Sequence, residues 1–240
     1  MSRKNQRTDP FNGILLVDKP SAWTSHDVVA KIRSYFSLNK VGHAGTLDPL
    51  ATGLLILLIG KATKLSNSIM GGDKIYNAKV KFGLTTATQD IDGKIIKTSD
   101  TSMINSNKIT KTLPFFTGEI KQLPPMVSAI KKDGMPLYKL ARKGIEIERE
   151  ERSIKIKKLE LIEFNNPYAS FKIICSKGTY VRTLANDIGD KLGCGGCLKK
   201  LRREASDPFT IDKAHSLDFI LSKTRDTLQE ISICTEEMST

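Results

Sequence analysis

Short apolar runs, separated by glycine, proline and charged residues, mark the first third of the chain. Two such runs carry no charge, and each is expected to be a buried strand. Between them, apolar residues recur at helical spacing up to Phe36, and Thr24 or Ser25 just before this stretch is a suitable N-cap. The expected elements are therefore strands at 13–17, 54–59 and 75–82, with helices at about 24–36 and 63–70.

The second half of the chain has strands and helices in irregular alternation. Phe171, Ile173 and Cys175 are spaced to share one face of a strand, and Thr179 is a suitable cap for the helix that follows. No regular strand–helix–strand repeat occurs, so an α+β architecture is favoured over a doubly wound parallel sheet. The expected elements here are a turn at 83–93 with a returning strand from Ile95, helices at about 107–116, 137–143 and 179–192, strands at 153–164 and 170–176, and a basic apolar segment at 197–203.

Composition adds a charge argument to this outline. The 240 residues suit one large domain or one domain with a modest appendage. Lys and Arg number 38 against 26 Asp and Glu, a formal net charge of +12, which favours a polyanionic partner such as nucleic acid. The alternative is a basic protein that charge keeps in solution.

Targeting features are not expected. The polar start, residues 1–11, is interpreted as a solvated tail without the apolar segment of a secretory signal. The longest strictly apolar run, 54–59, is far too short to span a bilayer. Four scattered cysteines do not form a disulfide framework, so we expect a cytoplasmic protein with reduced thiols.

Asp48 is the first candidate for chemistry, in the loop Gly42-His-Ala-Gly-Thr-Leu-Asp-Pro49. Pro49 biases the backbone of Asp48 toward an extended conformation, and the core strand after it is expected to hold the loop rigid. A carboxylate on a stiff loop at the mouth of a sheet suits a nucleophile or a base. The alternative is an aspartate that only organises a turn through its own backbone.

Arg182 and Tyr76 each have two interpretations. Arg182 is expected in the first turn of a helix, where a cation opposes the helix dipole, so RNA phosphate or a carboxylate is expected to compensate it. The alternative is a solvated arginine. Tyr76 begins a strand beside basic residues and can stack on a nucleobase, whereas the alternative is a core tyrosine.

The 124–147 segment carries a cluster of basic residues. Its aromatic neighbour Tyr138 and the preceding Pro124-Pro125 fit an insertion that contacts RNA, although a solvated face has the same composition. The cluster comprises Lys131, Lys132, Lys139, Arg142 and Lys143. Together with the Lys199-Lys200 and Arg202-Arg203 pairs, it is expected to supply several phosphate contacts.

Metal and nucleotide sites are not expected. Cys194 and Cys197 lack a second cysteine pair, and His215 is the only histidine near them, so the ligand count for structural zinc fails. Gly60-Lys-Ala-Thr63 misses two required positions of a phosphate-binding loop. We therefore expect no cofactor.

Seven short motifs occur in one order along the chain, and together they closely resemble the TruB family, the tRNA pseudouridine-55 synthases. The resemblance covers about residues 12–210. The motifs are Asp18-Lys-Pro20, Gly42 to Gly53, Lys74-Ile-Tyr76, Gly83 to Gly93, Ser128-Ala-Ile-Lys131, Ser176 to Arg182 and Leu201-Arg-Arg203.

The resemblance implies a pseudouridine synthase fold of α+β class, with a central, mostly antiparallel sheet, flanking helices and an RNA-binding cleft. It makes Asp48 the catalytic aspartate, Tyr76 the residue that stacks on the target uracil and Arg182 the partner of the aspartate. The substrate-binding residues that we expect are His43, which helps to wedge the T-loop open, Tyr180 and Leu201, which line the uracil pocket, Lys19, which with Pro20 supports the loop of Asp48, and Asp90, Lys139, Arg142 and Lys143.

The implied activity is isomerisation of uridine to pseudouridine at position 55 in the T-loop of tRNA, by base flipping and attack of the aspartate. The implied partner is the T-arm stem-loop of tRNA, with neither a membrane nor a nucleotide cofactor, and we expect a monomer. Residues 12–221 are expected to form the catalytic domain, with 124–147 closing over the T-arm and 222–240 as a C-terminal tail. About 30 residues after Phe209 are too few for the RNA-binding PUA domain of many bacterial members.

Two departures and two rival functions stay open. Ala22 and Ala44 stand where many family members carry Gly and Thr, which puts only the local loop geometry in question. One rival is an RNA-binding protein or RNA chaperone without catalysis. The other is a related synthase that acts on a different RNA or is guided by other proteins.

Overall fold

The computed structural model describes residues 12–132 and 134–234, so the expected tail at 1–11 lies outside the described residues. The chain divides into two compact units. Unit 1 holds the residues before Lys74 and those from Arg202 onward, and unit 2 holds Lys74–Leu201. Strand β12 (Gly196–Ser206) passes from one unit to the other, because the division falls between Leu201 and Arg202.

Unit 1 is built on two apolar strands that pair over their whole length. β1 (Gly13–Lys19) and β3 (Thr52–Ile59) are antiparallel, with Gly13 opposite Ile59 and Lys19 opposite Gly53. Both apolar runs are thus the buried strands that their sequence predicts. Short strands extend the pair: β2 (Val41–His43) on β3, β14 (His215–Ser216) and β15 (Ile233–Cys234) on β1, and the end of β12 on β3.

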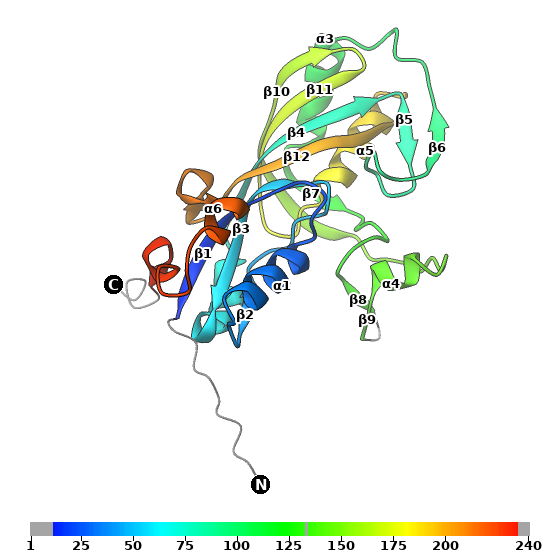
Figure 1. Cartoon of the computed structure of the whole chain (residues 1–240). Helices are drawn as coiled ribbons and strands as arrows, with labels where there is room; N and C mark the ends of the chain where they lie inside the picture. Colours follow the sequence, from blue (N-terminus) through cyan, green and yellow to red (C-terminus); the bar gives the residue numbers. More distant parts are fainter. Residues whose placement is uncertain (1–11, 133, 235–240) are drawn as a thin grey trace. The chain divides into compact units, whose positions relative to one another are not determined.

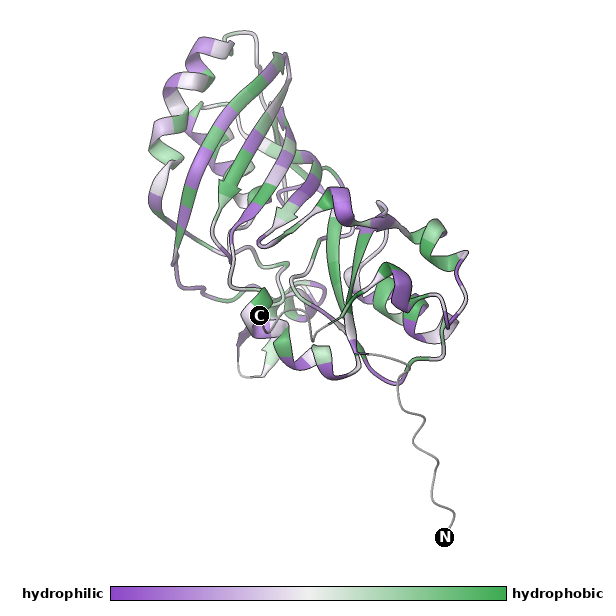
Figure 2. Cartoon of the chain, turned by 90° about the vertical axis from the view of Figure 1, so that its left-hand side faces the viewer, coloured by the Kyte–Doolittle hydropathy of each residue, from purple (hydrophilic) through white to green (hydrophobic). Residues whose placement is uncertain are grey.

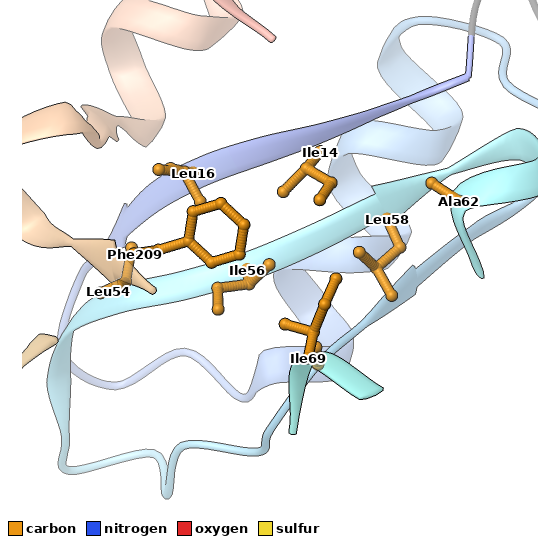
Figure 3. Packing of buried hydrophobic residues seen from close by; sticks show 9 residues of the cluster. Ile14, Leu16, Leu54, Ile56, Leu58, Ala62, Ile69 and Phe209 are labelled. Carbon is orange, nitrogen blue, oxygen red and sulfur yellow. The ribbon is translucent and has the colours of Figure 1, made fainter. Parts of the chain in front are cut away.

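The core of unit 1 lies on one face of this pair. Alternate residues of β1 and β3 point to the same side, and Phe209 and Ile69 pack over them (Figure 3). Burying such side chains stabilises a fold by roughly 1.5–3 kcal/mol each. The buried members are Ile14, Leu16, Ala44, Leu54, Ile56, Leu58, Ala62, Ile69 and Phe209.

Helix α1 (Ser25–Tyr35) begins as predicted. Thr24 is its N-cap, and the Thr24 and Asp27 side chains each accept a hydrogen bond from the other residue's backbone N–H. The helix expected over 63–70 is instead divided into the 3₁₀ helix η1 (Gly60–Leu65) and a single turn, α2 (Ser66–Ile69). Neither element has a side-chain cap, so the continuous helix has no start signal.

The rest of unit 1 comes from the end of the chain. It comprises β13 (Phe209–Thr210), η3 (Ile211–Lys213), α6 (Leu217–Leu221) and η4 (Gln229–Ile231). Leu228 is buried and β15 pairs with β1, so the described part of the expected C-terminal tail, 222–234, is packed on the unit.

Unit 2 contains a sheet in the order β12-β4-β11-β10-β7. β4 (Lys74–Phe82) pairs with β11 (Tyr168–Cys175), which pairs with β10 (Arg152–Asn165), which pairs with β7 (Gly118–Gln122), all antiparallel. Phe171, Ile173 and Cys175 share a buried face, as predicted. Figure 2 shows the resulting alternation of hydrophilic and hydrophobic bands along the long strands.

Helices cover the sheet of unit 2 and short elements extend from it. The main helix is α5 (Val181–Lys191). β8 (Lys131–Lys132), β9 (Met135–Pro136) and α4 (Leu137–Ala141) lie away from the sheet (Figure 1). The other elements are α3 (Ser106–Thr112), η2 (Leu113–Phe116) and the hairpin of β5 (Leu84–Thr86) with β6 (Ile95–Thr98).

The α+β class is confirmed. The strand pairs are mostly antiparallel, with β1–β14 and β3–β12 as parallel pairs. The 197–203 segment, expected only as a basic apolar stretch, is the middle of strand β12, in which buried and partly exposed positions alternate from Leu201 to Ala205. No helix among the described residues is both long enough and apolar enough to cross a membrane.

Candidate active site

The loop that carries Asp48 is hydrogen-bonded to the first residue of α1 and to the turn before that helix. The Ser25 hydroxyl donates to the carbonyl of Leu47 at 3.1 Å and accepts from the N–H of Leu47 at 2.9 Å. The N–H of Ala22 donates to the carbonyl of Pro49 at 2.9 Å. These bonds hold the residues on both sides of Asp48, whose side chain is partly exposed. The loop is therefore anchored by hydrogen bonds on both sides of Asp48.

Lys19 lies under this loop as a fully buried cation. Its Nζ donates to the carbonyls of Trp23 at 2.6 Å, Pro20 at 2.8 Å and Pro49 at 3.4 Å. Burial lowers the pKa of Lys19 to about 8, the charge of Asp48 opposes this shift, and Arg203 adds to it. The expected support of the Asp48 loop by Lys19 thus has a direct hydrogen-bond basis.

Arg203 braces the other side of the loop. Its guanidinium donates to the carbonyls of Leu54 at 2.7 Å and Gly45 at 3.1 Å, and the side chain is buried. Gly53 has a φ of 95°, and a Cβ there would lie 2.3 Å from the carbonyl oxygen of Arg203. Only glycine permits this approach of β3 to β12.

The sequence predicts Arg202 and Arg203 as a pair of phosphate contacts. This prediction is wrong for Arg203, which is buried, and for Arg202, whose side chain is 39% exposed, it stays a prediction. Arg203 is buried as described, and Arg202 makes a two-pronged ion pair with Asp18, at 2.8 and 3.0 Å. Adjacent residues of a strand point to opposite faces, which explains the two different partners. Sequence alone does not show that both guanidinium groups are already engaged.

His43 lies at the end of β2, two strands away from β1. Burial lowers its pKa first, and the nearby charges of Arg203 and His26 lower it further. Its Nδ1 has no hydrogen-bond partner among the described residues. The ring is therefore held in its neutral form at pH 7.

In unit 2, Tyr76 lies on β4 opposite Ile173 of β11. Its side chain belongs to the buried face of the sheet, with only 8% exposed. The core interpretation of Tyr76 thus describes its position, and stacking of the ring on a nucleobase stays a prediction.

Arg182 is the second residue of α5 and is buried, so the predicted first-turn position is confirmed and the solvated alternative is wrong. Its Nη2 donates to the carbonyl of Val127 at 2.6 Å, and its Cζ lies 5.8 Å from the centre of the Tyr180 ring. The two expected site residues are therefore neighbours.

The start of α5 differs from the prediction. Its N-cap is Tyr180, without a capping side chain, while the Thr179 hydroxyl donates backward to the carbonyl of Ser176 at 3.0 Å. The buried amide of Gln122 holds Tyr180 instead, by bonds to its N–H and its carbonyl. Sequence reasoning missed Gln122, although a Gln directly before Leu-Pro-Pro is a polar residue at a strand end.

Asp90 organises its own loop. Its carboxylate accepts from the Thr88 hydroxyl at 2.5 Å and from the N–H of Asp92 at 3.2 Å. Its carbonyl accepts from the Thr86 hydroxyl at 2.6 Å, and the residue is buried beside Leu198 of β12. The expected substrate contact of Asp90 stays a prediction.

The basic cluster lies on and beside α4. Lys139, Arg142 and Lys143 are exposed, and the Arg142 guanidinium lies 5.5 Å from the centre of the Tyr138 ring. A nearby cavity of about 220 Å³ is lined by Lys131, Lys132, Arg149 and Arg152, together with Glu148 and Glu150. This segment therefore presents unburied positive charge.

The expected site residues divide between the two units. Lys19, His43 and Asp48 belong to unit 1, and the others, with buried Leu201 as the last, belong to unit 2. Within unit 1 the fold brings Lys19 under the Asp48 loop, and within unit 2 it brings Arg182 beside Tyr180. The described residues contain no cluster of three or more His, Cys, Asp or Glu that could hold a metal.

Known families match nearly the whole described chain. The N-terminal domain model of the TruB family pseudouridylate synthases matches residues 33–181, and the tRNA pseudouridylate synthase B C-terminal domain model matches residues 182–232. A tRNA pseudouridine synthase B from Syntrophotalea carbinolica is 51% identical over 210 residues, 88% of this chain and 69% of the relative. The Opitutus terrae protein of the same name is 50% identical over 210 residues, 88% of this chain and 87% of the relative.

Solved structures agree on the fold. The Cbf5-Nop10-Gar1 complex contains a chain with a TM-score of 0.69 and 29% identity, covering 91% of this chain and 61% of its own length. The archaeal box H/ACA sRNP Nop10-Cbf5 complex gives 0.70 and 23%, covering 98% and 63%. This chain thus spans less than two thirds of those solved chains.

Proposed function

Because the chain belongs to the TruB family of pseudouridine synthases, we propose that it isomerises uridine to pseudouridine in tRNA, at position 55 of the T-loop. The observation that carries the proposal is the Asp48 loop, which Ser25, Lys19 and Arg203 fasten from three sides. A reactive carboxylate needs this fixed position, because a displacement of about 1 Å can cost roughly a hundredfold in rate.

The chemistry requires a base outside its stack. A uridine in a folded loop hides its glycosidic bond, so the base is flipped out at a cost of a few kcal/mol. Asp48 then attacks the nucleotide as a nucleophile, the C–N glycosidic bond breaks, and the uracil rotates. A C–C bond forms and the bond to Asp48 breaks, which frees the carboxylate. C5 loses its proton and N1 gains one, so the reaction is redox-neutral.

Tyr76 and Arg182 complete the proposed catalytic group. The ring of Tyr76 stacks on the target uracil, an interaction worth about 1–3 kcal/mol per base. Arg182 supplies a positive charge that keeps the nucleophile ionised. Tyr180 and Leu201 line the uracil pocket, and His43 helps to open the T-loop with a neutral ring.

Asp48→Asn tests the nucleophile. The amide keeps the shape of the side chain and is a far poorer nucleophile, so tritium release from 5-tritiated uridine in tRNA is expected to fall below about a tenth of wild type, with tRNA affinity largely kept. Asp226→Asn, the same change at an exposed position, serves as the control. An Asp48→Asn protein with more activity than this would remove Asp48 from the role.

The substrate itself is tested with a T-arm stem-loop. The basic segment 124–147 is proposed to close over the T-arm, and the enzyme to act as a monomer in the cytoplasm. A bare stem-loop is then a competent substrate without a guide. If product forms only from full-length tRNA and not from the stem-loop, or only when other proteins are added, a guided synthase is favoured instead. RNA binding without any product would favour an RNA chaperone.

A further inference from the structure

The first turn of α5 has an electrostatic cost that its own sequence does not offset. No side chain caps the helix at Tyr180, and no acidic residue occurs in the first turn. Arg182 places a buried cation there, close to the positive end of the helix dipole. Contacts from other segments of unit 2 must therefore hold this turn in place.

Gln122 makes the most complete of these contacts. Its Oε1 accepts from the N–H of Tyr180 at 2.8 Å, and its Nε2 donates to the carbonyl of Tyr180 at 3.1 Å. The side-chain amide thus pairs with both backbone polar groups of one residue, as a neighbouring strand would. Gln122 is 3% exposed, so water does not replace these bonds when the side chain is shortened.

The segment that contains Gln122 makes a second hydrogen bond to α5. Gln122 ends β7, and five residues later the carbonyl of Val127 accepts from Arg182. A third attachment joins the Thr183 hydroxyl to Oε1 of Gln89 at 2.7 Å. Three of the four residues from Tyr180 to Thr183, all but Val181, are thus each held by a separate polar contact.

We propose that Gln122 is a positioning residue, whose amide sets the backbone of Tyr180 and thereby the direction in which Arg182 is presented to the substrate. The inference rests on the proposed roles of Tyr180 and Arg182. Gln122 itself lies too deep to reach the RNA, and its effect passes through the peptide group that it holds. Loss of the amide is expected to affect the rate of the chemical step far more than the affinity for tRNA.

Gln122→Met tests this with a side chain of similar size and no amide. The single-turnover rate is expected to fall by roughly 10- to 100-fold, the cost of a small misplacement, while the Kd for tRNA stays within about threefold. Gln229→Met makes the same change at an exposed position and is expected to alter neither quantity. A rate within about threefold of wild type, or a loss confined to Kd, would overturn the proposal.

Gln122→Glu tests the donated hydrogen bond, because its protonated form can restore that bond within one variant. A protonated carboxyl has one O–H donor and one C=O acceptor, the same pair that the amide offers, whereas the carboxylate only accepts. The ratio of variant to wild-type rate is expected to rise as the pH is lowered from about 8 toward about 5.5. Burial raises the pKa of the new carboxyl, while the charges of Arg152, opposite position 122 on β10, and of Arg182 lower it. A ratio that does not change with pH contradicts the role of the donated bond.

Two measurements separate this proposal from the proposed function. Amide hydrogen exchange at Tyr180 reports the Gln122 bond whatever reaction the protein catalyses, and Gln122→Met is expected to speed it at least tenfold. Unchanged exchange would overturn the positioning role, while absence of pseudouridine formation by the wild type would overturn only the function. In a double-mutant cycle with Arg182→Lys, the two rate losses are expected to be strongly non-additive, and additive losses would show that Gln122 does not act through Arg182.

Discussion

Single buried charges define the site at the scale of residues. Lys19, Arg182 and Arg203 are all buried, and each donates hydrogen bonds to backbone carbonyls. A buried cation is costly unless it is hydrogen-bonded, so these side chains fix the loops that supply the carbonyls.

His43 allows a pH test at the same scale. Because its pKa is lowered, the folded protein binds fewer protons than the unfolded chain between the lowered value and about 6.5, so stability falls as the pH falls through that window. His43→Gln is therefore expected to lose less stability than wild type between pH 7 and pH 5. Thermal unfolding of both proteins measures this, with His215→Gln as control, and equal losses in all three would contradict it.

At the scale of elements, the turn between β1 and α1 bears on the Asp48 loop. Ala22 in this turn has a φ of 67°, a region that residues with a Cβ rarely adopt, while its N–H holds the carbonyl of Pro49. The resemblance to the family leads us to expect Gly here, and Gly reaches this conformation without strain, whereas Ala22 does not. Ala44 is instead buried in the core of unit 1, with its N–H bonded to the carbonyl of Ile56.

Ala22→Gly is expected to stabilise the protein. The change removes left-handed strain of about 1–2 kcal/mol and adds backbone entropy to the unfolded chain, for a net gain of roughly 0.5–1 kcal/mol. The methyl group is exposed, so no packing is lost. Denaturant unfolding measures the gain, and Ala30→Gly, inside α1, is expected to destabilise. A loss of stability in Ala22→Gly would show that the turn carries no strain.

At the scale of the whole molecule, charge is the dominant property. The net charge of +12 and the exposed Lys139, Arg142 and Lys143 beside α4 suit contacts with RNA phosphates. Burial removes Arg203 from the expected phosphate contacts, which are therefore expected mainly of this cluster and of exposed Lys200.

Replacing Lys139, Arg142 and Lys143 with Ala is expected to flatten the salt dependence of tRNA binding. The slope of log K against log salt is about −0.7 per phosphate contacted, so three lost contacts change it by roughly two units. Turnover at saturating tRNA is expected to change little, because phosphate contacts position the RNA. Alanine at exposed Lys94, Lys97 and Lys108 removes equal charge elsewhere, and equal slopes in both triple variants would make the cluster only a solvated face.

Local features followed from the sequence alone. Thr24 caps α1, the apolar runs are strands β1 and β3, and the 170–176 stretch buries alternate residues, because each depends on neighbours a few positions away. The order of motifs around Asp48, Tyr76 and Arg182 is enough to indicate the family from sequence alone, and the family is confirmed. Their individual roles stay predictions.

Tertiary structure decided which polar residues are engaged. The bond from Arg203 to Leu54 spans 149 positions, and those between Gln122 and Tyr180 span 58. Nothing near Arg203 in sequence separates a buried brace from a phosphate contact, and nothing near Thr179 shows that Gln122 takes over the start of α5. Such partners depend on which strands and helices pack together. Burial of apolar side chains across the whole unit decides that packing, and the sequence around a single residue does not contain this information.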